Sequence, residues 1–287
     1  MSTQALENII NRLRSEENRW DAILELKLFD ATDYVFYFIN LLTDKNWLVR
    51  WCSIEKLADI GNAQAIAPLL VILNESDPQL RNSAAKSLVK FGKAALPGLL
   101  MQFQNLNVEV RKAVYKVLHS QGGKIVSDLE DALKDQNWII SNRILHLIFN
   151  IGGMEAELVL ISSLTNKLVQ KNCILFLAQL KTKKALNPLF QMYDQPNLKP
   201  ILISVFKFLG PDTWLELVEK LNGQDLNDAK KAGKILIRLT PMITPLLLTA
   251  LKARDTNKKR IGTVLDVIQK KEAAKSGKKT GEKIVIK

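Results

Sequence analysis

The chain has 287 residues, of which 47% are hydrophobic and 7% aromatic, a composition that is ample for a continuous core and favours helices over strands. The formal net charge is +12, and residues 252–287 alone carry +8 of it. The basic character is therefore mainly a property of the C-terminal end, and it is only weak support for nucleic-acid binding by the folded part.

Targeting and redox features indicate a cytoplasmic protein. Residues 1–19 are polar and charged, so no export signal is expected. The longest apolar stretch, residues 34–42, contains Asn40 and is far shorter than the roughly 20 residues that cross a bilayer. Two cysteines, Cys52 and Cys173, are too few for a disulfide framework or a zinc site and fall on predicted helices, where reduced, buried thiols are ordinary.

A pattern of three residues recurs along the whole chain; in most copies the first residue is apolar and the next two are more polar. Its second member stands at positions 19, 50, 81, 111, 141, 170, 199, 230 and 259, in steps of 29 to 31 residues. Seven residues after that member stands an apolar residue in every copy except the last, which has Asp266. Further apolar residues three and four positions away complete a helical face, so each copy predicts a helix.

Several copies close on a glycine, which is the residue that takes a left-handed backbone at a helix end without steric cost. These glycines are Gly61, Gly92, Gly122, Gly152 and Gly210. A shorter apolar segment follows, as at residues 65–73, 94–103 and 185–192, and predicts the partner helix of a hairpin. Asp44, Asp77 and Asp135 precede the next copy, where a carboxylate can cap free N–H groups.

Two copies are the clearest: Asp44-Lys-Asn-Trp-Leu-Val-Arg50 with Leu57 and Gly61, and Asp77-Pro-Gln-Leu-Arg81 with Leu88 and Gly92. They resemble the HEAT repeat, in the short form known from phycobilisome-lyase-type proteins. The resemblance implies an all-α fold, a right-handed α-solenoid of about nine HEAT-like helical hairpins. It is strong over residues 33–153 and poor beyond residue 222.

We expect two segments of different character. One hairpin cannot bury its apolar face alone, so stacked hairpins should form one cooperative array over residues 1–269. Residues 270–287 are basic and have little to bury, and they predict a disordered C-terminal tail.

In HEAT arrays the second helix of each pair lines a concave groove, and the resemblance implies the same here. Columns of positions spaced by four residues should face that groove. The residues we expect to form a partner-binding groove are Trp20, Trp51, Asn82, Lys86, Lys90, Lys112, Lys116, Asn142, His146 and Lys171. The lysines would steer an acidic partner and the tryptophans would anchor it; the alternative is a solvated, lysine-rich helix face.

A second set of residues has an architectural interpretation. The resemblance implies that Arg50, Arg81 and Arg111 tie neighbouring repeats, together with the preceding Asp44 and Asp77. A ladder of arginines that binds phosphates is the alternative, and the motif position favours the architectural role. Trp47 and Trp138 share a phase in the loop before the helix, and we interpret them as packing between repeats rather than as a stacking platform for bases.

The sequence contains no recognisable catalytic motif. The two histidines, His119 and His146, stand in different columns, and the repeated His-Glu pairs with which HEAT proteins such as deoxyhypusine hydroxylase hold iron do not occur. We therefore predict no catalytic residue, no metal and no cofactor. Two enzyme classes stay open through fold resemblance alone: a bilin lyase-like chaperone or transferase, and an alkylpurine-DNA-glycosylase-like enzyme, for which Trp51 and Asp59 could share the groove.

These observations lead to one preferred function. We expect a monomeric, non-catalytic scaffold or adaptor that binds another protein or an acidic peptide segment along the basic concave groove. Nucleic-acid binding by the groove and the tail is the alternative. The sequence does not settle whether any enzymatic activity exists.

Overall fold

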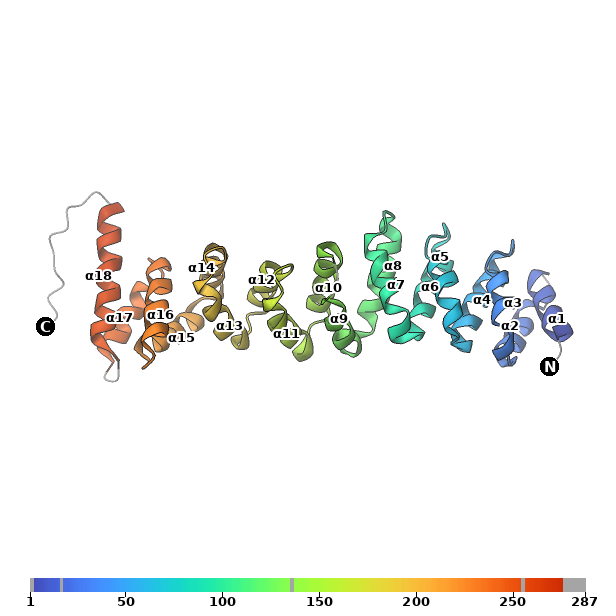
Figure 1. The fold of residues 1–287 in the computed structure, drawn as a ribbon, viewed down its shortest axis with the longest axis horizontal. Coiled ribbons are helices and arrows are strands. Elements are labelled where there is room, and N and C mark those ends of the chain that lie inside the picture. The colour runs from blue at the N-terminus through green and yellow to red at the C-terminus, as the bar shows by residue number, and fades with distance from the viewer. Residues whose placement is uncertain (1–2, 16–17, 135–136, 254–255, 276–287) are drawn as a thin grey trace. The chain divides into compact units, whose positions relative to one another are not determined.

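The structure is a computed structural model that describes residues 3–15, 18–134, 137–253 and 256–275. All regular elements in these ranges are helical (Figure 1). None of the helices formed by the described residues is both long and apolar enough to cross a membrane. Asp135, which the sequence suggested as a helix cap, and residues 276–287 of the predicted tail lie outside the described ranges.

In the part of the chain that the structure describes, the α-helices follow one another in nine pairs. The first helices of the pairs are α1 (Thr3–Arg14), α3 (Val35–Leu41), α5 (Ile66–Ile72), α7 (Leu96–Met101), α9 (Val126–Ala132), α11 (Gly153–Ser162), α13 (Leu186–Gln191), α15 (Pro211–Asn222) and α17 (Thr244–Lys252). The second helices are α2 (Arg19–Leu28), α4 (Trp47–Ile60), α6 (Pro78–Lys90), α8 (Val108–Ser120), α10 (Trp138–Ile151), α12 (Gln170–Leu180), α14 (Lys199–Leu209), α16 (Leu226–Arg238) and α18 (Lys258–Lys275).

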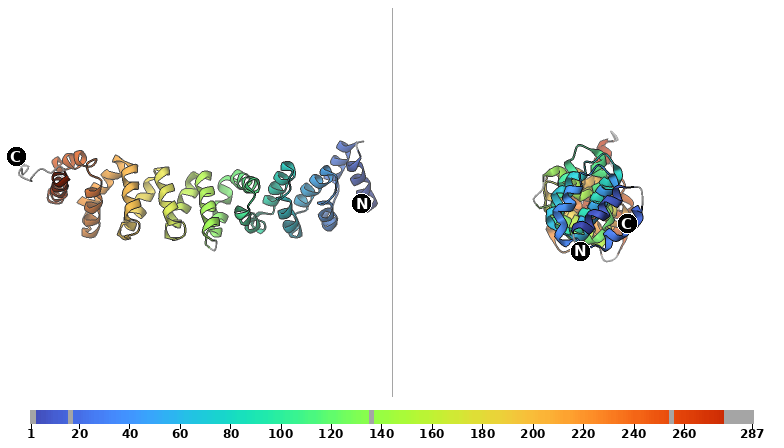
Figure 2. Two further views of the ribbon diagram at one scale, coloured as in Figure 1. Left: turned by 90° about the horizontal axis from the view of Figure 1, so that it is seen from above. Right: turned by 90° about the vertical axis from the view of Figure 1, so that its right-hand side faces the viewer.

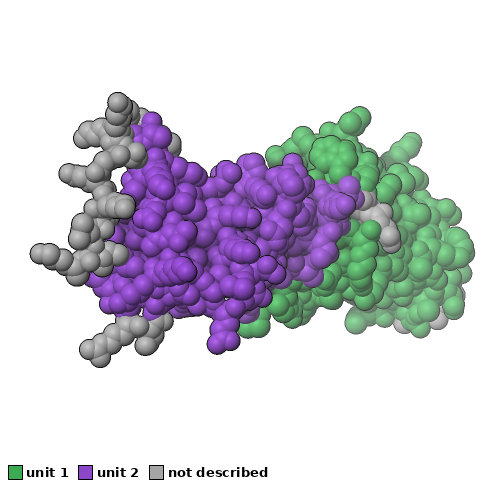
Figure 3. Space-filling view, turned by 60° about the vertical axis from the view of Figure 1, so that its left-hand side comes forward, with its two compact units in different colours: residues 1–159 green, residues 160–287 purple. Residues whose placement is uncertain are grey.

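The chain divides into two compact units, unit 1 (Met1–Val159) and unit 2 (Leu160–Lys287) (Figure 3). Within each unit, consecutive hairpins stack side by side (Figure 2). In unit 1 the second helices α4, α6, α8 and α10 contact one another in series, and in unit 2 α12 contacts α14 and α16 contacts α18. Within the described ranges, the predicted all-α fold of HEAT-like helical hairpins is confirmed.

The apolar residues that the repeat places seven positions after its second member belong to the core. In unit 1, Leu57, Leu88, Leu118 and Ile148 are buried. The pattern slips by one residue in α16, where Leu236 is fully buried and Ile237 is only half-buried. This slip decides which side chains of α16 reach solvent.

Three arginines of the repeat, Arg50, Arg81 and Arg111, close the loop that leads into their own helix. The guanidinium donates to the carbonyl six residues earlier: Arg50 to Asp44 at 2.8 Å, Arg81 to Glu75 at 2.8 Å and Arg111 to Asn105 at 2.6 Å. In α12 the amide of Gln170 makes the same bond to Leu164, at 2.8 Å. These bonds, charge-assisted where the donor is arginine, satisfy loop carbonyls that no helix pairs, and they stay within one repeat.

The two aspartates of the motif have different roles. Asp77 caps α6 by accepting from the amide of Gln79, whereas Asn46 is the cap of α4. Asp44 instead pairs with Arg14 of the preceding hairpin at 2.7 Å. Although burial opposes ionisation of Asp44, its bonds from Arg14 and from the amide of Asn46 lower its pKa below the ordinary value.

The glycine that ends α4 gives a test of the backbone argument. Gly61 has φ of +70°, and a Cβ there would meet nothing within 4 Å, so Gly61→Ala should cost only the left-handed backbone, about 1 kcal/mol of unfolding free energy. The matched control is Gly262→Ala in α18, which is equally uncrowded without positive φ and should stabilise by about 0.5–1 kcal/mol. Urea unfolding followed by circular dichroism measures both, and equal shifts of the two midpoints would contradict the assignment.

Candidate functional site

The second helices of unit 1 present one continuous surface, which we call the second-helix face of unit 1. It consists of the solvent-exposed columns of α4, α6, α8 and α10, and these helices are held in register by the buried residues on their opposite sides. Of the residues predicted from sequence, Asn82, Lys86, Lys90, Lys112, Lys116 and His146 are exposed here, while Trp51 and Asn142 are half-buried.

The remaining predicted groove residues lie elsewhere. Trp20 is on α2 and is 80% exposed. Lys171 is exposed on α12, in unit 2. The lysines named together from the sequence are therefore divided between two units.

Local ion pairs neutralise part of the charge on the second-helix face of unit 1. Lys90 pairs with Asp59 at 3.0 Å, and Lys112 pairs with Glu109 at 2.9 Å. Among the residues that the structure describes, no carboxylate pairs with Lys86 or Lys116. These two lysines are the cations that remain available to a partner.

A cavity of about 280 Å³ lies beside Trp51, between α2 and α4, with α6 at its edge. Its apolar wall is made by Ile23, Leu26 and the indole of Trp51, and its charged wall includes Lys86. The other lining residues are Lys27, Cys52, Glu55, Lys56 and Asp59. A hollow of this size holds one large side chain or a small molecule, and its combination of an apolar wall and a few charged groups is typical of binding pockets.

The ammonium group of Lys56 is fixed at the edge of this cavity. It donates to the backbone carbonyls of Phe29 at 2.6 Å and Lys27 at 3.2 Å, across the hairpin boundary. Burial lowers the pKa of Lys56 from its usual range. Because both of its bonds go to the backbone, Lys56 holds the loop after α2 in place, whereas Lys86 is free to meet a ligand.

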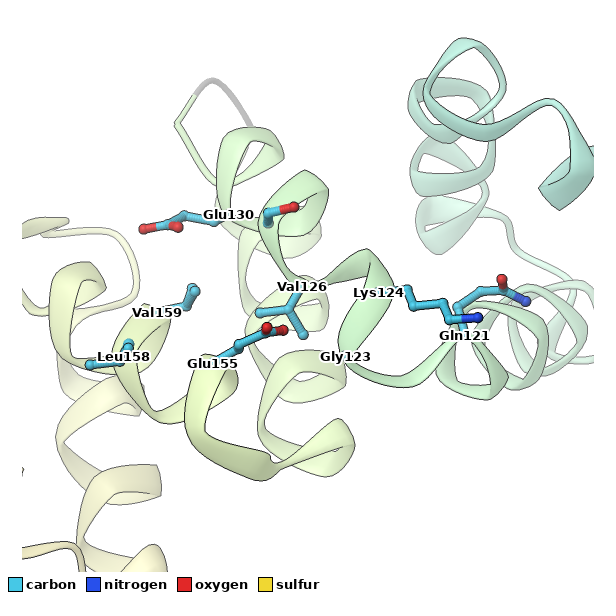
Figure 4. A pocket seen from close by; sticks show the side chains of 9 residues that line it. Gln121, Gly123, Lys124, Val126, Glu130, Glu155, Leu158 and Val159 are labelled. Atoms are coloured by element: carbon cyan, nitrogen blue, oxygen red, sulfur yellow. The ribbon is translucent and has the colours of Figure 1, made fainter.

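A second hollow, of about 720 Å³, lies on the first helices of unit 1 (Figure 4). Val126, Leu158 and Val159 form its apolar side, and the carboxylates of Glu130 and Glu155 lie at the same hollow, from α9 and α11. It contains none of the residues predicted from sequence. Its charged side chains are these two carboxylates and the ammonium group of Lys124.

Two tryptophans correct the interpretation made from the sequence. We expected both side chains to be packed between repeats, but Trp47 is 48% exposed and Trp138 is 62% exposed. Each is the first residue of its helix, α4 or α10, directly after an asparagine cap. At this position the side chain lies ahead of the apolar side that the helix buries, and both rings remain largely in solvent.

The structure brings together two histidines that the sequence left apart. His119 of α8 and His146 of α10 both contact Asn150: the His119 ring lies 3.3 Å from its carbonyl, and Nδ1 of His146 lies 2.9 Å from its side-chain amide nitrogen. Tyr115 accepts from the same amide at 2.8 Å and stacks on His119. The cluster joins two repeats by polar contacts, and within the described ranges no group of three or more acidic, histidine or cysteine side chains could hold a metal.

The helical hairpins that stack within each unit define a class of protein, the all-α helical-repeat proteins. Residues 3–89 match the family model of HEAT repeats, so the resemblance seen in the sequence is confirmed over this range. Among curated proteins, none matches the chain.

Similar solved structures span most of the chain. Human deoxyhypusine hydroxylase in complex with glycerol is 17% identical, with 93% of this chain and 96% of that chain covered and a TM-score of 0.33. The complex of CpcE and CpcF of phycocyanin lyase from Nostoc sp. is 15% identical, covers 92% and 93%, and has a TM-score of 0.34. An engineered protein is 18% identical, covers 82% and 96%, and has a TM-score of 0.27.

Both cysteines should be chemically silent in the folded protein. Burial raises the pKa of Cys52 and of Cys173 to about 12, and the thiolate is the reactive form. We expect neither thiol to react with a disulfide reagent at pH 8 in native protein, and both to react in urea. Rapid modification of native Cys52, which borders the cavity beside Trp51, would show that this hairpin opens; the Cys52→Ser variant identifies which thiol reacts.

Proposed function

We propose that the chain is a non-catalytic scaffold or adaptor that binds another protein on the second-helix face of unit 1. The observation that carries the proposal is the cavity beside Trp51, because interfaces concentrate their binding energy in a few aromatic anchors that fill such pockets. The partner would place one apolar side chain against Ile23, Leu26 and Trp51.

The charges around the cavity favour an acidic segment in the partner. Lys86 stands at the cavity, and Lys116 lies on the next second helix of the same face without a carboxylate partner among the described residues. A partner carboxylate that meets Lys86 would also raise the rate of encounter, since exposed charge steers association. We propose a cytoplasmic, monomeric protein in this role.

Two observations among the described residues weigh against the enzyme interpretations. For a glycosylase-like reaction the carboxylate of Asp59 should be free, but it is paired with Lys90 at 3.0 Å. The thiol at the cavity is no activated nucleophile, because burial raises the pKa of Cys52 to about 12.

Charge reversal tests the face as a whole. The triple variant Lys86→Glu, Lys112→Glu and Lys116→Glu should lose the partners that wild-type protein captures in an affinity pull-down from its own cell extract. The matched control is Lys45→Glu, Lys124→Glu and Lys134→Glu, which changes the charge equally at exposed positions outside this face. Retention of every partner by the first variant rejects the proposal.

The anchor is tested separately. Trp51→Ala should weaken binding to a captured partner by about 2 kcal/mol or more, as for a central hot-spot residue, whereas Trp47→Ala on the same helix α4 should leave it nearly unchanged. Isothermal titration calorimetry with the purified partner gives both values. Equal affinities for the two variants would show that the cavity is not the anchor.

A further inference from the structure

The net charge of the chain is concentrated in unit 2. Residues 160–287 carry 24 Lys+Arg and 10 Asp+Glu, a net charge of +14, whereas residues 1–159 carry 17 and 19, a net charge of −2. Residues 160–251 already carry +6, with 12 basic and 6 acidic side chains. The folded helices of unit 2 therefore contribute to the basic character as well as the C-terminal end.

A stripe of three cations forms the exposed side of α16. From Lys230 to Arg238, the exposed side chains of this helix are Lys230, Lys234 and Arg238, and the others are buried or half-buried. Four-residue spacing places successive cations about 6 Å apart along the helix axis, which is within the screening length of about 8–10 Å at moderate salt. The three charges therefore act together on a ligand.

The carboxylates near this stripe are engaged elsewhere. Asp194 pairs with the buried Lys231 at 2.7 Å, Asp225 caps the start of α16 through the amides of Asn227 and Asp228, and Asp228 lies 4.0 Å from Lys220. Among the described residues, none of the three stripe cations has an ion-pair partner. This differs from unit 1, where Lys90 and Lys112 are neutralised locally.

An exposed aromatic ring stands on α14, the preceding second helix, at the position equivalent to Arg238. Phe208 stands thirty residues before Arg238. The same shift of thirty residues aligns the buried residues of the two helices: Leu202, Val205 and Phe206 of α14 correspond to Ala232, Ile235 and Leu236 of α16. Phe208 is 58% exposed, and the ammonium of Lys181 lies 5.7 Å from its ring centre. Exposed rings combined with nearby cations are the means by which proteins hold single-stranded nucleic acids, through base stacking and contacts with the phosphate backbone.

We infer that unit 2 binds single-stranded nucleic acid, with the phosphates along Lys230, Lys234 and Arg238 and a base stacked on Phe208. An acidic protein is the alternative polyanionic ligand. Protein interfaces, however, rely on an apolar anchor in a pocket, as proposed for unit 1. Unit 2 offers instead the three cations of the stripe and the exposed ring of Phe208. The site is independent of the proposed protein-binding face, since none of its residues is in unit 1.

The test uses full-length protein and a fluorescein-labelled oligothymidylate, with binding followed by anisotropy over a salt series. Wild-type affinity should fall steeply with salt, and the variant Lys230→Glu, Lys234→Glu and Arg238→Glu should bind at least about tenfold more weakly, with a salt slope smaller by about 2, because each lost phosphate contact removes about 0.7 from it on a single strand. Phe208→Ala should weaken binding about fivefold or more while leaving the slope unchanged.

The matched control is Lys167→Glu, Lys183→Glu and Lys252→Glu, which removes the same charge from exposed positions of unit 2 away from α16 and should keep the wild-type slope. Circular dichroism confirms that the variants are folded. The inference is overturned if wild-type protein does not bind at low salt, if both triple variants lose the same affinity, if Phe208→Ala binds like wild type, or if poly-glutamate binds to the stripe and the oligonucleotide does not.

Discussion

The structure depends on one constraint: a two-helix hairpin of this length leaves an apolar side uncovered, and only the next hairpin can cover it. Leu57, Leu88, Leu118 and Ile148 show the solution in unit 1, where each is buried at the same position of its repeat. Because the apolar sides are consumed by stacking, the opposite sides of the second helices must face solvent. The packing of the core therefore determines which helix faces are available to bind a partner.

The fold was largely predictable for this reason. A repeat of near-constant length indicates where helices begin and which side they bury, and the glycines that end them need a backbone that other residues avoid: Gly61 has φ of +70°. The details that periodicity missed are local. The sequence predicts Asp44 as the cap of the next helix, but the side chain of Asn46, two residues later, accepts the capping hydrogen bond from Leu48. Asp44 forms an ion pair with Arg14 instead.

The candidate sites were predictable only in part, because exposure and pairing depend on neighbouring helices. The columns of α6 and α8 are exposed as expected, but the ion pairs of Lys90 and Lys112 follow from contacts that the sequence does not display. The cavity beside Trp51 requires α2 and α4 together. The stripe on α16 was missed because the repeat slips there by one residue, so its exposed column appears only when the buried residues of α14 and α16 are matched.

The loop closures by Arg50, Arg81 and Arg111 reach back only six residues along the chain. Other contacts, such as those of Lys56 with the carbonyls of Lys27 and Phe29, cross from one hairpin to the next, whereas these three contacts are local to their own repeat. Short-range contacts of this kind favour rapid folding that can start at several places. Local loop contacts also allow whole hairpins to be gained or lost in evolution while these loops keep their conformation in the remaining hairpins. The number of hairpins can then change with the size of the ligand.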